Sequence, residues 1–251
     1  MWRGDLQLAK ATLERIPPST LQDDVIATNV FIVYLWLHES QNSLFLLNGV
    51  PREWLSSPPF EGPKTFLLGM ARLMAEQTEL AQRDFQRALD LIEKHLAVDP
   101  NNLNLLGLKA EALFYLHERA EAERTYLLVR ELSASRALEL GPAATQAAAA
   151  TDLLFPMAAR SRELFESQDA VIDNLESTFE ENWSLTAAGL RLEPIFETLR
   201  TNPRFVKLLA RAEADPRKSP IAAAPAVATP ALSRADSPDG RDGSNSKPDA
   251  K

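Results

Sequence analysis

The sequence predicts an all-α protein, a solenoid of stacked helical hairpins followed by an irregular tail. Three observations support this: one residue spacing occurs twice, apolar residues recur at helical intervals with almost no strand signal, and the composition changes sharply after residue 212. In the repeated spacing, a small residue is followed by an alanine twelve residues later, an aromatic residue four further on and a small or branched residue three beyond it. The two copies are Gly69, Ala81, Phe85 and Ala88, and then Ala110, Ala122, Tyr126 and Val129.

This spacing suits two helices in close contact. A small residue on the first helix lets it approach the alanine of the second, and the aromatic ring fills the space beside them. Hairpins that stack in this way form a solenoid, and solenoids mostly bind other protein chains. A looser third copy consists of Ala158, Ala170, Asn174 and Ser177.

The N-terminal part is expected to contain three helices. The first spans 5–15 and is stopped by two prolines, and the second spans 21–38. Within the second, Val30–Tyr34 is β-prone by residue type, but it does not alternate, so we interpret it as part of a buried helix. A shorter helix follows at 40–47. The Pro-rich segment Ser56–Pro63 then predicts a linker or long turn.

The central part is expected to form two helical hairpins. Helices at 64–75 and 79–97 make the first, and helices at 103–116 and 120–132 make the second. The segment Asp99–Asn102 separates them with turn-forming residues and offers a cap to the next helix.

A further helix is expected to start at Gly141-Pro142, because proline suits the first turn of a helix. It would run through an alanine-rich tract towards Leu154 and Phe165, with a kink at Pro156, and pair with a helix at 170–179.

The last folded piece is expected at 190–214. Asn202-Pro203 predicts an N-cap followed by a first-turn proline. The end of a solenoid needs a cap, since its last apolar face would otherwise be wet. The residues expected to form this cap are Phe205, Leu208 and Leu209.

Two regions follow from composition. Residues 1–212 read as the folded helical repeat domain. Residues 213–251 are rich in Pro, Ala, Ser and Asp and are expected to be disordered, because they have too few large apolar residues to offset the entropy of ordering. Acids and bases balance from Glu213 onward, so the net charge of −8 lies on the first region. The negative charge of residues 1–212 argues against binding of nucleic acid and favours basic or apolar partners.

The chain contains no cysteine, which excludes disulfides, Cys-based zinc sites and thiol nucleophiles. The longest apolar run, Val30–Leu37, is far shorter than the ~20 residues of a membrane helix, so direct membrane insertion is not expected. We expect a cytoplasmic location, or a periplasmic one if the chain belongs to a longer membrane-anchored protein.

The hairpins 69–88 and 110–129, with the turn Asp99–Asn102, resemble tetratricopeptide repeats. The segment Leu190–Arg211 resembles the closing element of repeat arrays at the C-terminal end of bacterial multidomain signalling proteins, which follow a Ser/Thr kinase, an adenylyl cyclase or a TolB-like winged-helix regulator. The resemblance covers roughly residues 4–211. It implies a right-handed α-solenoid that binds protein or peptide.

Several positions depart from the repeat pattern. Arg72 stands where a tyrosine is usual, Asn174 where an aromatic is usual, and the helix at 79–97 is long. The chain also begins inside a repeat, because Gly4-Asp5 matches the turn between two paired helices. The stripe Leu6, Leu13 and Ile16 is therefore expected to lack a partner helix, which predicts either fraying of the first helix or a homodimer in which two copies cover each other's stripes.

No group of residues predicts catalysis. None of the three histidines has a second histidine three or four residues away, no His-Glu-x-x-His motif occurs, and the sequence has no phosphate-binding glycine loop or nucleophile elbow. We therefore expect no enzyme activity, no catalytic residue, no cofactor and no metal.

What remains is a binding surface. In arrays of this kind the first helix of each hairpin lines a concave groove, and Met and aromatic residues there suit a peptide or helix. The same register places Ile32 and Leu35 in this groove, although each such residue could equally be core. The groove residues expected to contact a partner are Trp36, Phe66, Met70, Met74, Glu111, Phe114, Tyr115, Phe155 and Arg162.

These observations favour a non-enzymatic scaffold that binds a protein or peptide partner in its groove. The alternative is the regulatory or sensory C-terminal fragment of a bacterial signalling kinase, adenylyl cyclase or transcriptional regulator. Sequence upstream of Met1 would distinguish the two.

Overall fold

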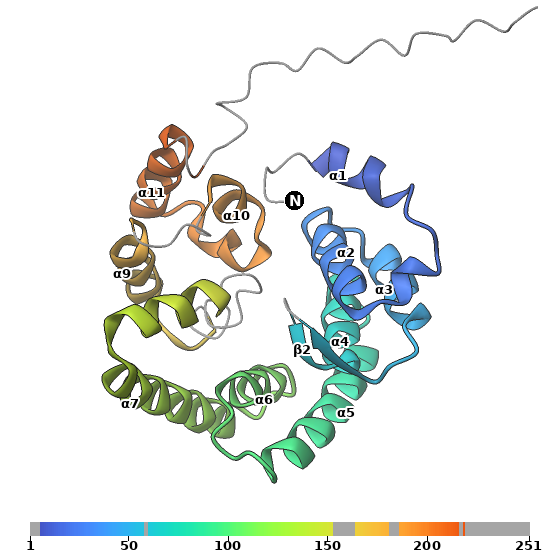
Figure 1. Ribbon diagram of the computed structural model, residues 1–251, viewed down its shortest axis with the longest axis horizontal. Coiled ribbons are helices and arrows are strands. Elements are labelled where there is room, and N and C mark those ends of the chain that lie inside the picture. The colour runs from blue at the N-terminus through green and yellow to red at the C-terminus, as the bar shows by residue number, and fades with distance from the viewer. Residues whose placement is uncertain (1–5, 58–59, 153–163, 181–185, 216–217, 219–251) are drawn as a thin grey trace, which may run out of the picture.

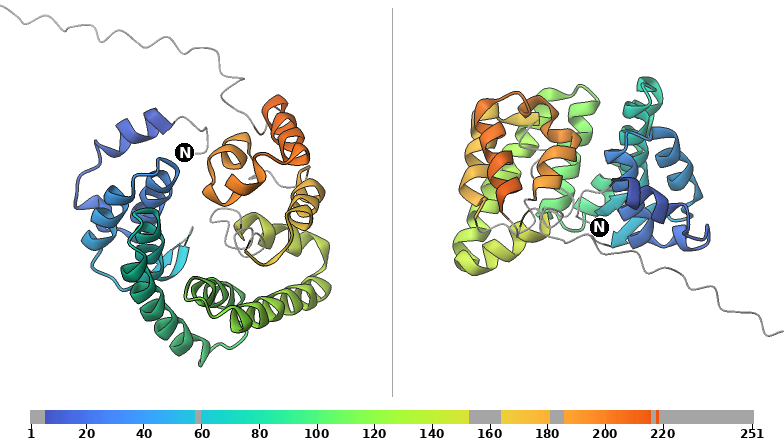
Figure 2. Two further views of the ribbon diagram at one scale, coloured as in Figure 1. Left: turned by 180° about the vertical axis from the view of Figure 1, so that it is seen from behind. Right: turned by 90° about the horizontal axis from the view of Figure 1, so that it is seen from above.

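The computed structural model describes residues 6–57, 60–152, 164–180, 186–215 and 218. These residues are mostly helical, as predicted, with one short two-stranded sheet. The helices follow one another around an open ring whose two ends approach each other (Figure 1). Seen from above, the helices stand side by side in two groups, an N-terminal and a C-terminal one (Figure 2). Most of the predicted tail (216–217 and 219–251), Phe155, Arg162 and the kink at Pro156 lie outside the described residues.

The ring begins with α1 (Leu6–Leu13), a short 3₁₀ helix η1 (Thr20–Gln22), α2 (Asp24–Trp36) and α3 (Ser40–Gly49). Asp23 starts α2, because its carboxylate accepts from the backbone N–H of Val25 and Ile26 at 3.1 and 3.2 Å. The β-prone segment Val30–Tyr34 lies inside α2, as predicted. Val30 to Val33 are all buried, so the middle turn of this helix is covered on every side and its sequence shows no amphipathic period.

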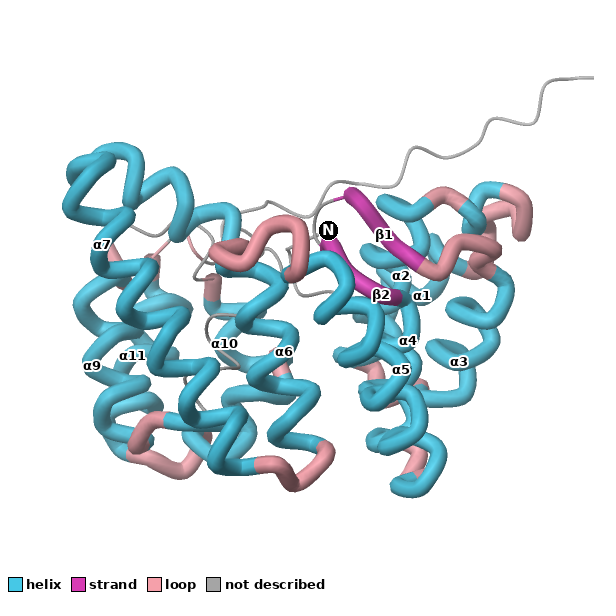
Figure 3. The backbone as a smooth tube through the Cα atoms, turned by 90° about the horizontal axis from the view of Figure 1, so that it is seen from below, coloured by secondary structure: helices cyan, strands magenta, loops and turns pink. Residues whose placement is uncertain are grey.

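An antiparallel hairpin of β1 (Trp54–Ser57) and β2 (Phe60–Pro63) stands where the sequence predicted only a linker. It lies on the inner side of the ring, near α4 and α6 (Figures 1 and 3). Leu55 and Phe60 are buried, and Trp54 stacks on His95 of α5 with ring centroids 3.7 Å apart. The Pro-rich composition predicts a linker or long turn, whereas tertiary packing of these apolar side chains stabilises a hairpin.

The next elements are α4 (Lys64–Met74), α5 (Thr78–Leu96), α6 (Leu103–Tyr115) and α7 (Arg119–Asp152). The first three match the predicted helices to within one residue at either end. The break predicted at Gly141-Pro142 is wrong, because α7 continues through it. The ribbon of α7 changes direction along its length (Figure 1), as a helix does when an internal proline removes a backbone donor.

The chain closes with α9 (Gln168–Thr178), α10 (Ala187–Leu192), the 3₁₀ helix η2 (Pro194–Leu199) and α11 (Pro203–Ala214). The predicted N-cap is confirmed: Asn202 Oδ1 accepts from the backbone N–H of Arg204 at 3.0 Å. Lys218 is buried, and its carbonyl accepts from Ala187 N at 3.0 Å. The packed body therefore extends past the boundary predicted at residue 212.

Among the described residues, the buried apolar side chains form two separate cores. The first core joins α1 to α7 and the β-hairpin, and the second joins α9, α10, η2 and α11. Phe205 and Leu208 belong to the second core with exposures of 0% and 1%, and Leu209 packs against it. These three residues thus lie on the face of α11 that packs in the second core, and their role as the cap of a solenoid stays a prediction.

Three turns between paired helices have the same geometry. His38, Glu76 and His117 each adopt positive φ, at 56°, 58° and 66°. In each turn the next residue donates its backbone N–H to a carbonyl five residues earlier; the pairs are Glu39 to Tyr34, Gln77 to Arg72 and Glu118 to Leu113. The hairpins α2–α3, α4–α5 and α6–α7 therefore share one turn.

The small residues of the repeated spacing lie where the helices touch. A Cβ atom added at Gly69 would come within 2.8 Å of the Phe85 ring, and Ala81 and Ala122 are 0% exposed. In the looser third copy, the buried residues of α9 are Val171, Ile172 and Leu175. The predicted Ala170 and Asn174 are only half-buried and Ser177 is exposed, so the spacing of this copy does not mark the buried face of α9.

Candidate functional site

The shared turns define equivalent positions in successive hairpins. Two residues before each positive-φ residue stand Trp36, Met74 and Tyr115, which we call the turn-edge row. All three belong to the set predicted to line a binding groove. Trp36 is buried, whereas Met74 and Tyr115 are half-buried. The row thus presents a large apolar or aromatic side chain from the first helix of each hairpin.

Most other predicted groove residues are less accessible. Phe66 and Glu111 are 0% exposed and Met70 6%, and Ile32 and Leu35 are buried as well. Packing from the β-hairpin and from neighbouring helices makes these residues core in this structure. Phe114 is half-buried. The accessible part of the predicted set is therefore Met74, Phe114 and Tyr115, with Phe155 and Arg162 outside the described residues.

A continuous chain of aromatic rings links the predicted residues across the helices. Each ring stacks on, or meets edge-on, the next one, with centroids between 4.7 and 6.1 Å apart. The chain runs through Phe60, Phe66, Phe85, Tyr115, Phe114, Phe165 and Tyr126 in that order.

A polar contact that sequence reasoning missed holds the far end of this chain. The Tyr126 hydroxyl donates to Glu166 at 2.6 Å, and Arg130 lies 3.6 Å from the same carboxylate. The Arg119 guanidinium lies over the Phe114 ring, 5.2 Å from its centroid. The contacts of Tyr126 and Arg130 with Glu166 join α7 to the segment before α9, and Arg119 and Phe165 both contact the Phe114 ring. No local motif marks the Glu166 contacts, because Tyr126 lies 40 residues before Glu166 in the sequence.

Arg72, which departs from the repeat pattern, pairs with Asp84 of the neighbouring helix at 2.5 Å. Burial raises the pKa of Asp84, and the charges of Arg72 and Arg87 oppose this rise. The equivalent positions of the next hairpin, on α6 and α7, are occupied by Leu113 and Thr125, and both residues are buried. The departure at Arg72 is therefore matched by an acid on the paired helix.

Lys109 of α6 joins three helices. Its ammonium group lies 2.8 Å from Glu93 of α5 and 3.4 Å from Glu121 of α7. Burial lowers the pKa of Lys109, but the two carboxylates more than offset this, so the pKa lies above its ordinary value. The lysine therefore stays charged and ties the second hairpin to the third.

A contact between distant segments closes the ring. The Trp36 indole N–H donates to the carboxylate of Glu193, and both residues are buried. Leu192, next to Glu193, packs against the first core. The first member of the turn-edge row is thus covered by the segment that follows α10.

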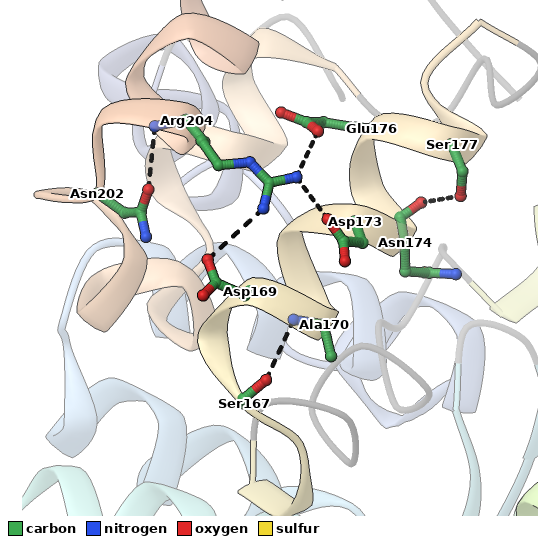
Figure 4. Close-up of polar contacts among 9 residues, drawn as sticks. All are labelled: Ser167, Asp169, Ala170, Asp173, Asn174, Glu176, Ser177, Asn202 and Arg204. Atoms are coloured by element: carbon green, nitrogen blue, oxygen red, sulfur yellow. Dashed lines mark hydrogen bonds and ion pairs between the residues drawn. The ribbon is translucent and has the colours of Figure 1, made fainter.

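The C-terminal helices α9 and α11 are clasped by Arg204 (Figure 4). Its guanidinium lies 2.5 Å from Asp173, 2.6 Å from Glu176 and 3.5 Å from Asp169. The carboxylates of Glu176 and Asp173 raise the pKa of Arg204 further above its ordinary value. These groups are largely exposed, so solvent screens the clasp and its main effect is to align the helices.

The stripe predicted to be open at the N-terminus is covered. Leu13 is buried, and Leu6 and Ile16 pack against the first core. Lys10 of α1 also pairs with Glu39 at the α2–α3 turn. The homodimer was predicted because this stripe was expected to be open, and the structure shows that it is covered within the chain.

Within the described part of the chain, no group of three or more His, Asp or Glu side chains could hold a metal ion. No described helix is both long and apolar enough to cross a membrane. Comparison with family models, with curated proteins and with solved structures found no match. The assignment of a function therefore depends on the geometry of the chain itself.

Proposed function

We propose that this chain is a non-enzymatic scaffold, a right-handed solenoid of the tetratricopeptide type, which binds a peptide or helix of a partner protein along its concave side. The observation that carries the proposal is the turn shared by the hairpins at His38, Glu76 and His117. Equivalent turns bring equivalent side chains to one edge of the array, and a row of equivalent side chains suits an elongated ligand.

The turn-edge row supplies the chemistry of the proposed surface. Met74 and Tyr115 are half-buried, and Phe114 next to Tyr115 is held by Phe165 and Arg119. Methionine adapts to ligands of different shape, and a held aromatic ring offers a large contact area at a small entropic cost. The surface therefore favours a segment with apolar side chains on one face.

The signalling alternative rests on sequence resemblance in Leu190–Arg211. In the structure this segment packs as α10, η2 and α11 around the second core. That packing is what a closing element requires, and it holds equally for a free-standing scaffold. The attachment to a kinase, cyclase or regulator stays a prediction.

The proposal is tested with the full chain as bait in extract of its source cells, using three baits. Met74→Glu places a charge on the turn-edge row, whereas Val98→Glu places one on a side chain that is 88% exposed between α5 and α6. We expect a partner that is enriched by the wild type and by Val98→Glu and lost with Met74→Glu, as quantified by mass spectrometry. Equal recovery of every protein by all three baits would refute the proposed surface.

A further inference from the structure

The surface around Trp36 already holds a segment of the same chain. Its hydrogen bond to Glu193 joins residues 157 positions apart, and the two side chains are only 5% and 6% exposed. Trp36 ends α2 in the first core, while Glu193 follows α10 in the second. The contact therefore spans the opening of the ring, where α2 and α10 lie beside each other (Figure 1).

The segment that carries Glu193 is divided between the two cores. Ala187 and Leu190 of α10 pack in the second core, but Leu192 packs against the first. An aliphatic side chain and the carboxylate after it thus both reach the first core, the carboxylate at Trp36 of α2. A hydrogen bond to a carboxylate is stronger than one between neutral groups, and a buried carboxylate needs such donors. The Trp36 surface thus offers an N–H donor to the carboxylate and apolar core residues to the aliphatic side chain.

The closing contact is separate from the packing that holds α10 in its own core. α10 has six residues, and its main packing is with α11 and η2 in its own core. Release of Leu192 and Glu193 would leave Ala187 and Leu190 in place. It would uncover the first position of the turn-edge row.

We infer that the Trp36 surface is a docking site for a partner segment in which a large aliphatic residue precedes a carboxylate, and that Leu192 and Glu193 occupy it as an internal ligand. This inference rests on the proposed scaffold function and specifies the chemistry of the partner. An internal ligand lowers the apparent affinity for a partner in proportion to the fraction of molecules that are open. A partner that displaces it gains Trp36 in addition to Met74 and Tyr115.

The test measures binding of a fluorescein-labelled peptide with the sequence of residues 186–199 to the full chain by fluorescence anisotropy. Glu193→Ala removes the internal carboxylate. Glu197→Ala is the matched control, because Glu197 is exposed and lies four residues further on. We expect Glu193→Ala to bind the peptide about tenfold or more tightly than the wild type and Glu197→Ala to bind it as the wild type does. A peptide that itself carries Glu193→Ala should bind the opened chain about tenfold more weakly.

A second variant covers the case in which Glu193→Ala does not fold, as judged by its circular dichroism. Trp36→Phe keeps an aromatic ring and removes the donor, so hydrogen exchange of residues 187–192 should become faster while that of α5 stays unchanged. Equal peptide affinity of wild type, Glu193→Ala and Glu197→Ala, or unchanged exchange in Trp36→Phe, would overturn the inference. If Met74→Glu still loses a partner in that event, the scaffold function stands and only the internal ligand is refuted.

Discussion

At the residue scale, the turn residues of the three hairpins are unusual. Positive φ is the conformation that glycine adopts most readily, yet His38, Glu76 and His117 stand there. In this conformation the Cβ atom of each residue lies close to the following carbonyl oxygen, which lowers the stability of the folded protein. The spacing that repeats in the sequence did not reveal these positions, because no glycine marks them.

Replacement of Glu76 by glycine is expected to stabilise the protein by about 0.5–1 kcal/mol, since it relieves the left-handed conformation. Urea unfolding followed by circular dichroism measures the change. Glu79→Gly is the control: it lies in the first turn of α5, where glycine is expected to lower the free energy of unfolding by a similar amount. A loss of stability in Glu76→Gly would contradict the turn assignment.

The buried pair of Arg72 and Asp84 predicts a pH-dependent variant. In Arg72→Leu the Asp84 carboxylate stays buried without its guanidinium partner, so the free energy of unfolding should fall by about 3 kcal/mol at pH 7. Burial already raises the pKa of Asp84 in the folded state, and loss of Arg72 raises it further. A raised folded pKa contributes stability below the unfolded pKa and loses it as pH rises through the folded pKa, so the deficit should shrink from pH 7 to pH 5.

The double variant Arg72→Leu/Asp84→Thr is the control for this pH dependence. It copies the pair Leu113 and Thr125 from the next hairpin, so it should recover most of the lost stability and show no extra pH dependence. A deficit in Arg72→Leu that stays constant between pH 7 and pH 5 would show that the Asp84 charge is not its cause.

At the scale of elements, α11 anchors the second core through one face. Phe205→Ala empties a fully buried site and should lower stability by about 3–5 kcal/mol, whereas Val206→Ala, on a side chain that is 50% exposed, should cost far less. Hydrogen exchange locates the effect: we expect faster exchange in α9 and α11 and little change in α4 and α5, because these belong to different cores. Equal acceleration in both groups would show that the two cores unfold as one.

At the scale of the whole molecule, the end of the packed body lies beyond the boundary that composition predicted. Lys218 is buried, bonds to Ala187 and places its ammonium group 4.5 Å from the centroid of the Phe179 ring. A 1–214 truncation loses these contacts. It should retain the total helix signal of the full chain but melt a few degrees lower, whereas a 1–220 truncation should melt as the full chain does. A large loss of helix signal in the 1–214 truncation would show that residues beyond 214 are needed to hold the helices, not only to raise the melting temperature.

Sequence by itself determined what depends on neighbours along the chain. The helices 64–75, 79–97 and 103–116, the cap at Asn202 and the close contacts at Gly69 and Ala81 follow from periodicity, turn chemistry and residue size. These features arise from interactions within a helix or between two consecutive helices. For the candidate site, the sequence predicted which residues share a helix face, but not which of them are accessible. The hairpin register shows the face that a residue occupies and not what covers that face.

Tertiary structure alone decided which of these positions are accessible. The β-hairpin at 54–63 places the Phe60 ring beside Phe66, and Glu193 contacts Trp36 from the other core, so both Phe66 and Trp36 are buried. The free energy of such long-range contacts depends on groups that are distant in the chain, so no local pattern records them.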